Sequence, residues 1–274
     1  MTSPIDPAST RRVIQLPLEP GLICLKGLSP TRLRFEVEYG LERGTSANSF
    51  LFSEGVTPAG QAVPPVLLFP PGESFAAPFL EQLQALVPAT AALKVVVGHV
   101  NPNRVAMLRH LASHWPELML VASNTGAKLL GELWSQRKPA APGSETGEAP
   151  TPPLPPLPPS LPPLDVVKQE VGRQLGNKHR ITLLPTPTPR WPGGLMAFEE
   201  STGLLMSGKF FSAHLCSEAW AASVAARRAR IAARRSSSLG WSAFLGGISR
   251  RVSWSMMSRA SITAGSVFSG SLNR

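Results

Sequence analysis

The stretch VVVGHVNPNR, residues 95–104, marks the change from strand to helix that sets the fold class of this chain. Its consecutive valines form an apolar run that is typical of a buried strand, and a glycine and a histidine follow them directly. From Val105 to Ala112, apolar residues recur at helical spacing. The stretch therefore predicts a buried strand, then a polar loop that contains His99, then a helix.

Strand and helix patterns alternate on both sides of this stretch. Apolar residues at helical spacing between Phe79 and Leu86 predict a helix upstream. Downstream, residues 118–122 predict a strand and residues 127–134 another helix. The alternation predicts an α/β protein in which helices pack on a sheet and sequential strands lie close together.

The two ends of this region have the pattern of β structure instead. Strands are predicted before it at residues 12–16, 22–26, 33–39, 49–52 and 66–69, and after it at residues 181–184, 195–198 and 204–207. Glycines between the first five of these runs indicate turns. The chain is therefore expected to begin with antiparallel β structure and to return to a sheet near its residue 181.

Composition separates three segments from this domain. Residues 137–164 contain the run PTPPLPPLPPSLPPL, which favours extended polyproline II and offers few backbone donors to a sheet. We predict a disordered, solvated insertion there, with an SH3 or WW ligand as the alternative. Residues 1–10 are small and polar, and are expected to be a disordered start. One domain then comprises residues 11–136 and 165–218.

The formal net charge of +10 is concentrated in residues 219–274, which contain nine arginines and no Lys, Asp or Glu. The preceding residues carry 18 basic and 17 acidic side chains, so that part is nearly neutral. We interpret this Arg- and Ser-rich tail as disordered or as an artefact of the gene model, with a genuine basic arm as the alternative. Its tryptophans are not interleaved with the arginines, which makes nucleic acid an unlikely partner.

Several classes of protein are excluded by what the sequence contains. Two cysteines, Cys24 and Cys216, rule out a disulfide scaffold and a four-cysteine zinc site. No apolar run approaches the roughly 18 to 20 residues that cross a bilayer, so we predict no integral membrane segment. GxGxxG, Walker and GxSxG motifs are absent.

Four segments, in chain order, resemble the flavodiiron proteins. Residues 35–50 are similar to the family's EFGLxxGTxxNSY, and residues 99–104 stand where the family has H-x-E-x-D-H. Residues 188–192, TPRWP, stand at its His-Trp-Pro segment, and residues 207–216 resemble its CDAFGxHxC. The resemblance implies a metallo-β-lactamase-like αββα sandwich over residues 12–218 without the insertion. Because part of the second sheet has no counterpart, we expect a truncated sandwich of marginal stability.

The resemblance also implies six positions at a diiron centre, of which His99 alone keeps the family's ligand. The substituted positions are Asn101 for Glu, Asn103 for Asp, Arg104 for His, Arg190 for His and Lys209 for the bridging Asp.

A diiron centre needs carboxylate oxygens and neutral imidazoles to offset its positive charge. Cations at three of the positions and weak, neutral asparagine ligands at two others imply a vestigial metal site. We therefore expect no bound metal, no catalytic residue and no cofactor in this chain. The cations are expected to form an anion pocket or to pair with nearby carboxylates.

The same exchange of residues is known in the A-type flavodiiron subunit of oxygenic phototrophs, which pairs with a subunit that keeps its ligands. The resemblance thus implies a fragment of an oxidoreductase subunit for electron transfer from NAD(P)H to oxygen, inactive alone, with FMN and diiron only in full-length members. It implies a hetero-oligomer located in the chloroplast stroma of a eukaryote or otherwise in the cytoplasm. The alternative is a non-catalytic binding protein that acts through the proline tract or the arginine-rich tail.

Other polar groups have structural interpretations. The turn SNTGAK, residues 123–128, could hold a phosphate at a helix N-terminus, but we favour a strand-to-helix turn within the domain. His110 and His114 have a spacing that can bind metal, yet they lack the intervening carboxylate and are expected at the surface. His179, between two basic residues, is expected to be solvated. A zinc hydrolase of the same fold would need HxHxDH at residues 99–104.

Overall fold

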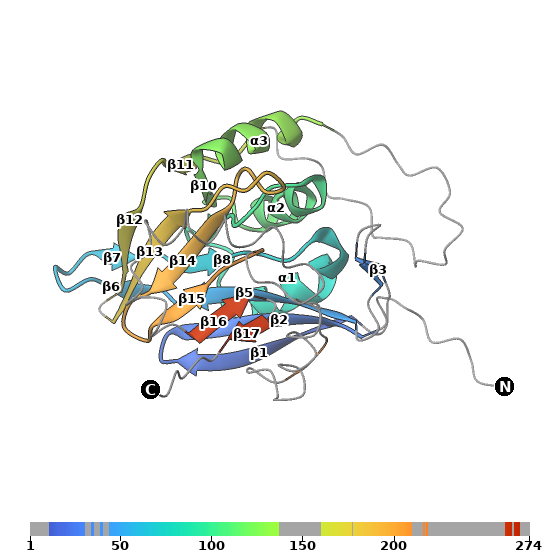
Figure 1. Cartoon of the computed structure of the whole chain (residues 1–274). Coiled ribbons are helices and arrows are strands. Elements are labelled where there is room, and N and C mark those ends of the chain that lie inside the picture. The colour runs from blue at the N-terminus through green and yellow to red at the C-terminus, as the bar shows by residue number, and fades with distance from the viewer. Residues whose placement is uncertain are drawn as a thin grey trace, which may run out of the picture.

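The computed structural model describes residues 11–30, 34–35, 39–40, 44–136, 160–176, 178–209, 216, 218, 261–264 and 266–268. These residues form a layer of helices and two β-sheets, with the first sheet in the middle (Figure 1). They supply three layers of the predicted αββα sandwich.

The first sheet has seven strands in the order β1-β2-β5-β8-β9-β10-β11. Its strands are β1 (Arg12–Glu19), β2 (Leu22–Ser29), β5 (Thr45–Phe52), β8 (Val66–Leu68), β9 (Lys94–Val96), β10 (Met119–Ser123) and β11 (Leu164–Val167). Neighbours are antiparallel from β1 to β8 and parallel from β8 to β11. Two short hairpins, β3 (Arg34–Phe35) with β4 (Tyr39–Gly40) and β6 (Gly55–Val56) with β7 (Ala62–Val63), accompany it.

Helices connect the parallel strands, because a parallel pair cannot be joined by a tight turn. They are η1 (Glu73–Phe75) with α1 (Ala76–Gln84), α2 (Pro102–His114) and α3 (Asn124–Trp134). Their apolar sides pack on one face of the first sheet in a core that includes Phe79, Leu108, Trp115 and Leu130. The helices and strands predicted between residues 66 and 134 are therefore confirmed.

The second sheet has the order β12-β13-β14-β15-β16-β17. Its strands are β12 (Val171–Leu175), β13 (His179–Pro185), β14 (Leu195–Glu199), β15 (Leu204–Met206), β16 (Ser261–Ala264) and β17 (Ser266–Phe268). It packs on the other face of the first sheet through a second apolar layer that joins Phe50, Leu68 and Val96 to Ile181 and Leu195.

β11 and β12 are among the strands that were not predicted, and β11 begins at the last residue assigned to the proline insertion. The carbonyl of Pro163 accepts a hydrogen bond from the Leu120 N–H at 2.9 Å, so a proline can still serve a sheet as an acceptor. Leu164 then pairs with Leu120, and the strand continues parallel to β10. The remainder of the proline tract, residues 137–159, lies outside the described residues, as do residues 1–10.

Within the tail that was expected to be disordered, the structure describes β16 and β17. β16 runs parallel to β15 from the pairing of Leu204 with Ser261, and β17 returns antiparallel to it. An edge strand such as β15 presents unpaired backbone groups that recruit another strand, and the segment SITAGSVF is rich in β-forming residues. The rest of residues 219–274 lies outside the described residues. No helix among those described is long and apolar enough to cross a membrane.

The expectation that His179 is solvated is wrong. Its side chain is buried, and its Nε2 donates to the carbonyl of Pro20 in the β1–β2 turn at 2.9 Å. Its Nδ1 lies 3.2 Å from Oε1 of Glu199, which is fully buried in β14. Glu199 also accepts hydrogen bonds from Ser201 and Thr202. The pair therefore connects the second sheet to a turn of the first.

This network gives a stability prediction that depends on pH. Burial alone would raise the pKa of Glu199, but the hydrogen bonds from Ser201, Thr202 and His179 outweigh it and lower the pKa. The Glu199 carboxylate therefore stabilises the fold above the pKa of the unfolded chain, and this contribution is lost as the pH falls through the folded pKa.

We expect Glu199→Gln to lower the free energy of unfolding at neutral pH by about 2 to 4 kcal/mol, measured by urea denaturation. The difference from the wild type should shrink in acid. Glu200→Gln is the matched control, because Glu200 is partly exposed and pairs with Arg180 at 3.3 Å; its effect should stay below about 1 kcal/mol. Equal losses in both variants would contradict the assigned role of Glu199.

Candidate functional site

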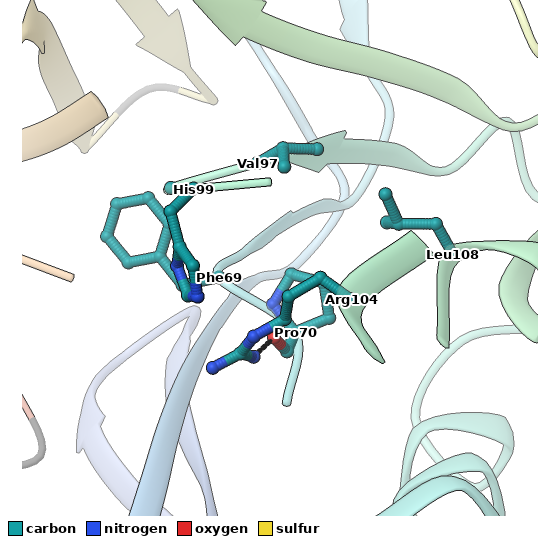
Figure 2. A pocket seen from close by; sticks show the side chains of 7 residues that line it. Phe69, Pro70, Val97, His99, Arg104 and Leu108 are labelled. Atoms are coloured by element: carbon teal, nitrogen blue, oxygen red, sulfur yellow. Dashed lines mark hydrogen bonds between the residues drawn. The ribbon is translucent and has the colours of Figure 1, made fainter. Parts of the chain in front are cut away.

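The candidate site lies where β8 and β9 end side by side and their loops lead to η1 and α2. The parallel pairing of β8 with β9 brings Phe69 and Pro70 next to Gly98 and His99. Figure 2 shows these residues, with Val97, Arg104 and Leu108, around a cavity of about 10 Å³. That volume is room for about one water molecule.

His99 is buried in this site, with 6% of its surface exposed. Its ring packs edge-on against Trp191, with 4.8 Å between ring centroids. Its Nε2 has no hydrogen-bond partner among the described residues. Burial, and then the charges of Arg104 and Lys209, hold the pKa of His99 well below its usual value, so the ring is neutral at pH 7.

The two asparagines at ligand positions form hydrogen bonds to backbone groups instead. Asn101 is the N-cap of α2, and its Oδ1 accepts from the Arg104 N–H at 2.8 Å. Asn103 is exposed, and its Oδ1 accepts from the Glu73 N–H at 2.9 Å. The sequence contained a signal for the first role, because an asparagine followed by a proline is a typical helix start.

The three cations gather around His99 and Trp191. Arg104 donates through Nη1 to the carbonyl of Pro70 (Figure 2), and its charge acts on His99. The guanidinium of Arg190 lies 5.8 Å from the centroid of the Trp191 ring, and Nζ of Lys209 lies 5.3 Å from it. Both distances are within the range of cation–π attraction.

The structure thus brings His99, Arg104, Arg190 and Lys209 together, while the polar groups of Asn101 and Asn103 face helix and loop backbone. Trp191 contacts three members of the group, and sequence reasoning missed its importance. The signal was present, because Trp191 follows Arg190 directly in the segment that carries the resemblance.

The turn at residues 123–128 is a structural helix start, as we favoured. The Ser123 hydroxyl is buried; it accepts from the Gly126 N–H at 3.1 Å and donates to the Gly193 carbonyl at 2.9 Å. A Cβ built on Gly193 would lie only 2.8 Å from the Gly126 Cα. The backbone of Gly193 therefore fills the space at the N-terminus of α3 where a phosphate would bind.

The histidines of α2 differ from expectation in one respect. His110 is buried, with 6% of its surface exposed, whereas we expected it at the surface. The reason is that α2 is buried on all sides along this stretch, because the seven consecutive residues 105–111 are all buried. The His114 Nδ1 is 2.8 Å from the His110 carbonyl, so this side chain forms a hydrogen bond with the backbone of its own helix.

Comparisons with known proteins agree with this fold and these motifs. No family model matches the chain. A putative diflavin flavoprotein A from Nostoc sp. is 36% identical over 196 residues, which are 72% of this chain and 29% of the relative. One from Synechocystis sp. is 35% identical over 68% of this chain and 26% of the relative. A metal-soaked flavodiiron core from Synechocystis sp. superposes with a TM-score of 0.73 at 26% identity, over 93% of this chain and 56% of that one.

The chain belongs to the flavodiiron family. Its described layers are those of the metallo-β-lactamase-like part of flavodiiron cores, as predicted from the sequence. This flavodiiron chain spans less than a third of the length of the curated relatives named above.

The donor set of this flavodiiron chain does not fit two iron ions. His99 offers one neutral imidazole, whose Nε2 could serve as a ligand. The oxygens of Asn101 and Asn103 already accept hydrogen bonds, and the remaining three positions carry positive charge. Two iron ions require anionic oxygen ligands. Over the described part of the chain, no three His, Cys, Asp or Glu side chains gather as a metal-binding group.

Close packing of Phe69 on Gly98 gives a prediction for this site. Phe69 has a φ of 58°, which is rare for a residue with a side chain, and a Cβ on Gly98 would lie 2.6 Å from its ring. Gly98→Ala should therefore lower the free energy of unfolding by about 1 to 3 kcal/mol, measured by urea denaturation.

Gly131→Ala is the matched control, because no atom lies within 4 Å of a Cβ at that position. Gly131 is in α3, so this substitution should be neutral or stabilising by up to about 1 kcal/mol. A Gly98→Ala variant as stable as the control would contradict the close packing at the site.

Proposed function

We propose that this chain is a subunit of a flavodiiron-type oxidoreductase that passes electrons from NAD(P)H to oxygen in photosynthetic organisms, and that its own diiron site is not functional. The observation that supports the second part is the charge at the ligand positions. Arg104 and Lys209 act on His99, and Arg190 and Lys209 lie over the neighbouring Trp191. Three fixed positive charges oppose the binding of two more cations.

The relatives support the photosynthetic setting, since the matched diflavin flavoproteins come from cyanobacteria. We propose the chloroplast stroma as the location in a eukaryotic phototroph, and the cytoplasm in a cyanobacterium. FMN and the iron pair belong, in this proposal, to full-length members of the family.

A chain without its own iron site needs a partner that has one. We propose a hetero-oligomer with a flavodiiron subunit that keeps the ligand residues. Co-expression of the two, with a tag on this chain, should recover both subunits in one complex during size-exclusion chromatography. Recovery of each subunit in its own peak would contradict the pairing.

The chain alone should neither hold iron nor reduce oxygen. After expression with added iron, we expect far less than one iron per chain by mass spectrometry, and no oxygen uptake with NADPH and FMN above the rate of flavin alone. The physical reason is the charge at the ligand positions. About two irons per chain, or oxygen uptake that His99→Ala abolishes, would contradict the proposal.

A further inference from the structure

The residues at the flavodiiron ligand positions make contacts within the protein that could hold this site together without iron. Arg104 donates to the Pro70 carbonyl, and Asn103 accepts from the Glu73 N–H at 2.9 Å. These contacts cross from α2 to the loop after β8 and to the first residue of η1. A Cβ on Gly72 would lie 2.7 Å from Nδ2 of Asn103, so the loop is pressed against this side chain.

The loop fixed in this way begins at a strained residue. Phe69, directly before Pro70, has a left-handed backbone, which is unfavourable for a residue with a bulky side chain. Its N–H donates to the Val96 carbonyl at 2.9 Å, and its carbonyl accepts from the Ser49 hydroxyl at 2.9 Å. Such a conformation persists only where surrounding contacts enforce it, and Arg104 supplies one at the next residue.

On the other side of the site, Trp191 is a common neighbour of two cations and of His99. Two cations from separate segments, Arg190 and Lys209, lie within 5.8 and 5.3 Å of its ring centroid. The face of an indole is negative and attracts cations, while its edge is positive. His99, which is kept neutral, packs against the same side chain in an edge-to-face arrangement.

We propose that the site at the family's ligand positions is an iron-independent structural node, in which Asn103 and Arg104 tie the segment from Pro70 to Glu73 to α2 and Trp191 holds Arg190 and Lys209 together through cation–π attraction. The inference rests on the proposed lack of iron in this chain. It adds a positive role for the substituted residues, which the sequence analysis treated as vestiges.

A double-mutant cycle tests the role of Trp191. Trp191→Leu should lower the melting temperature of the full chain by about 3 to 8 °C, and the same substitution in a Lys209→Met background should lower it by clearly less. In the Lys209→Met background the indole attracts only Arg190, so Trp191→Leu removes less cation–π attraction. Trp191→Phe retains an aromatic face and should lose less than Trp191→Leu.

The matched background is Lys178→Met, which removes an exposed lysine from the β12–β13 turn. Trp191→Leu should have its full effect there. Equal losses in the Lys209→Met and Lys178→Met backgrounds would show that Trp191 acts only by packing, which would overturn its part of the node.

The loop contacts are tested by substitutions that remove them. Arg104→His removes the contact with the Pro70 carbonyl, and Asn103→Ala removes the acceptor of the Glu73 N–H. Each should lower the melting temperature by a few degrees, and added Fe²⁺ should not restore it. EDTA should leave the wild type unchanged. Restoration by Fe²⁺, or no loss in either variant, would overturn the role of the loop contacts.

Iron determination on the same samples separates this inference from the proposed function. If the wild type carries iron, the proposed function fails whatever the cycle shows. If it carries none and the Trp191–Lys209 coupling is absent, the node fails while the proposed function stands.

Discussion

Face-to-face packing of the two sheets through one apolar layer is the constraint on which the rest of the structure depends. The first sheet contributes aromatic and aliphatic side chains to it, the second sheet contributes aliphatic ones, and most of them are almost fully buried. Polar groups can enter such a layer only with partners. The candidate site is therefore confined to the edge where β8 and β9 end. There, His99 follows the buried strand β9 and packs against Trp191.

Three positive side chains converge at this edge. Two of them lie over an indole, and the third donates to a backbone carbonyl. The neutral state of His99 follows from its burial first and then from the charges of Arg104 and Lys209, because a further positive charge would be unfavourable there.

Local pattern predicted most of the fold, and the resemblance to the flavodiiron proteins implied the position of the site. Apolar runs and helical spacing located β8 to α3, and the substituted motif placed His99, Arg104, Arg190 and Lys209 together. Interactions between distant residues account for the failures. His179 is flanked by two basic residues, and nothing nearby indicates that it is buried by Pro20, 159 positions away. β11 was missed because a proline-rich run masks a strand whose partner is β10.

The roles of single side chains were harder to predict than their locations. The resemblance places Asn101 at a substituted ligand position, whereas its neighbour Pro102 indicates the start of a helix, and in the structure Asn101 is the N-cap of α2. Trp191 became important only when Arg190, adjacent in sequence, and Lys209, distant in sequence, were placed over one ring. Such a role depends on three-dimensional arrangement, which no spacing rule contains.

The contact between Gly126 and Gly193 has a mechanical consequence. The two backbones are in contact there without an intervening side chain, and the Ser123 hydroxyl donates a hydrogen bond to the Gly193 carbonyl. Side chains can change rotamer to absorb a displacement, but two glycine backbones in contact cannot. The turn that carries Trp191 must therefore follow α3 as one rigid body. A shift of this helix, whose last residues lead into the proline-rich segment, would move the indole relative to His99 without any change at the site itself.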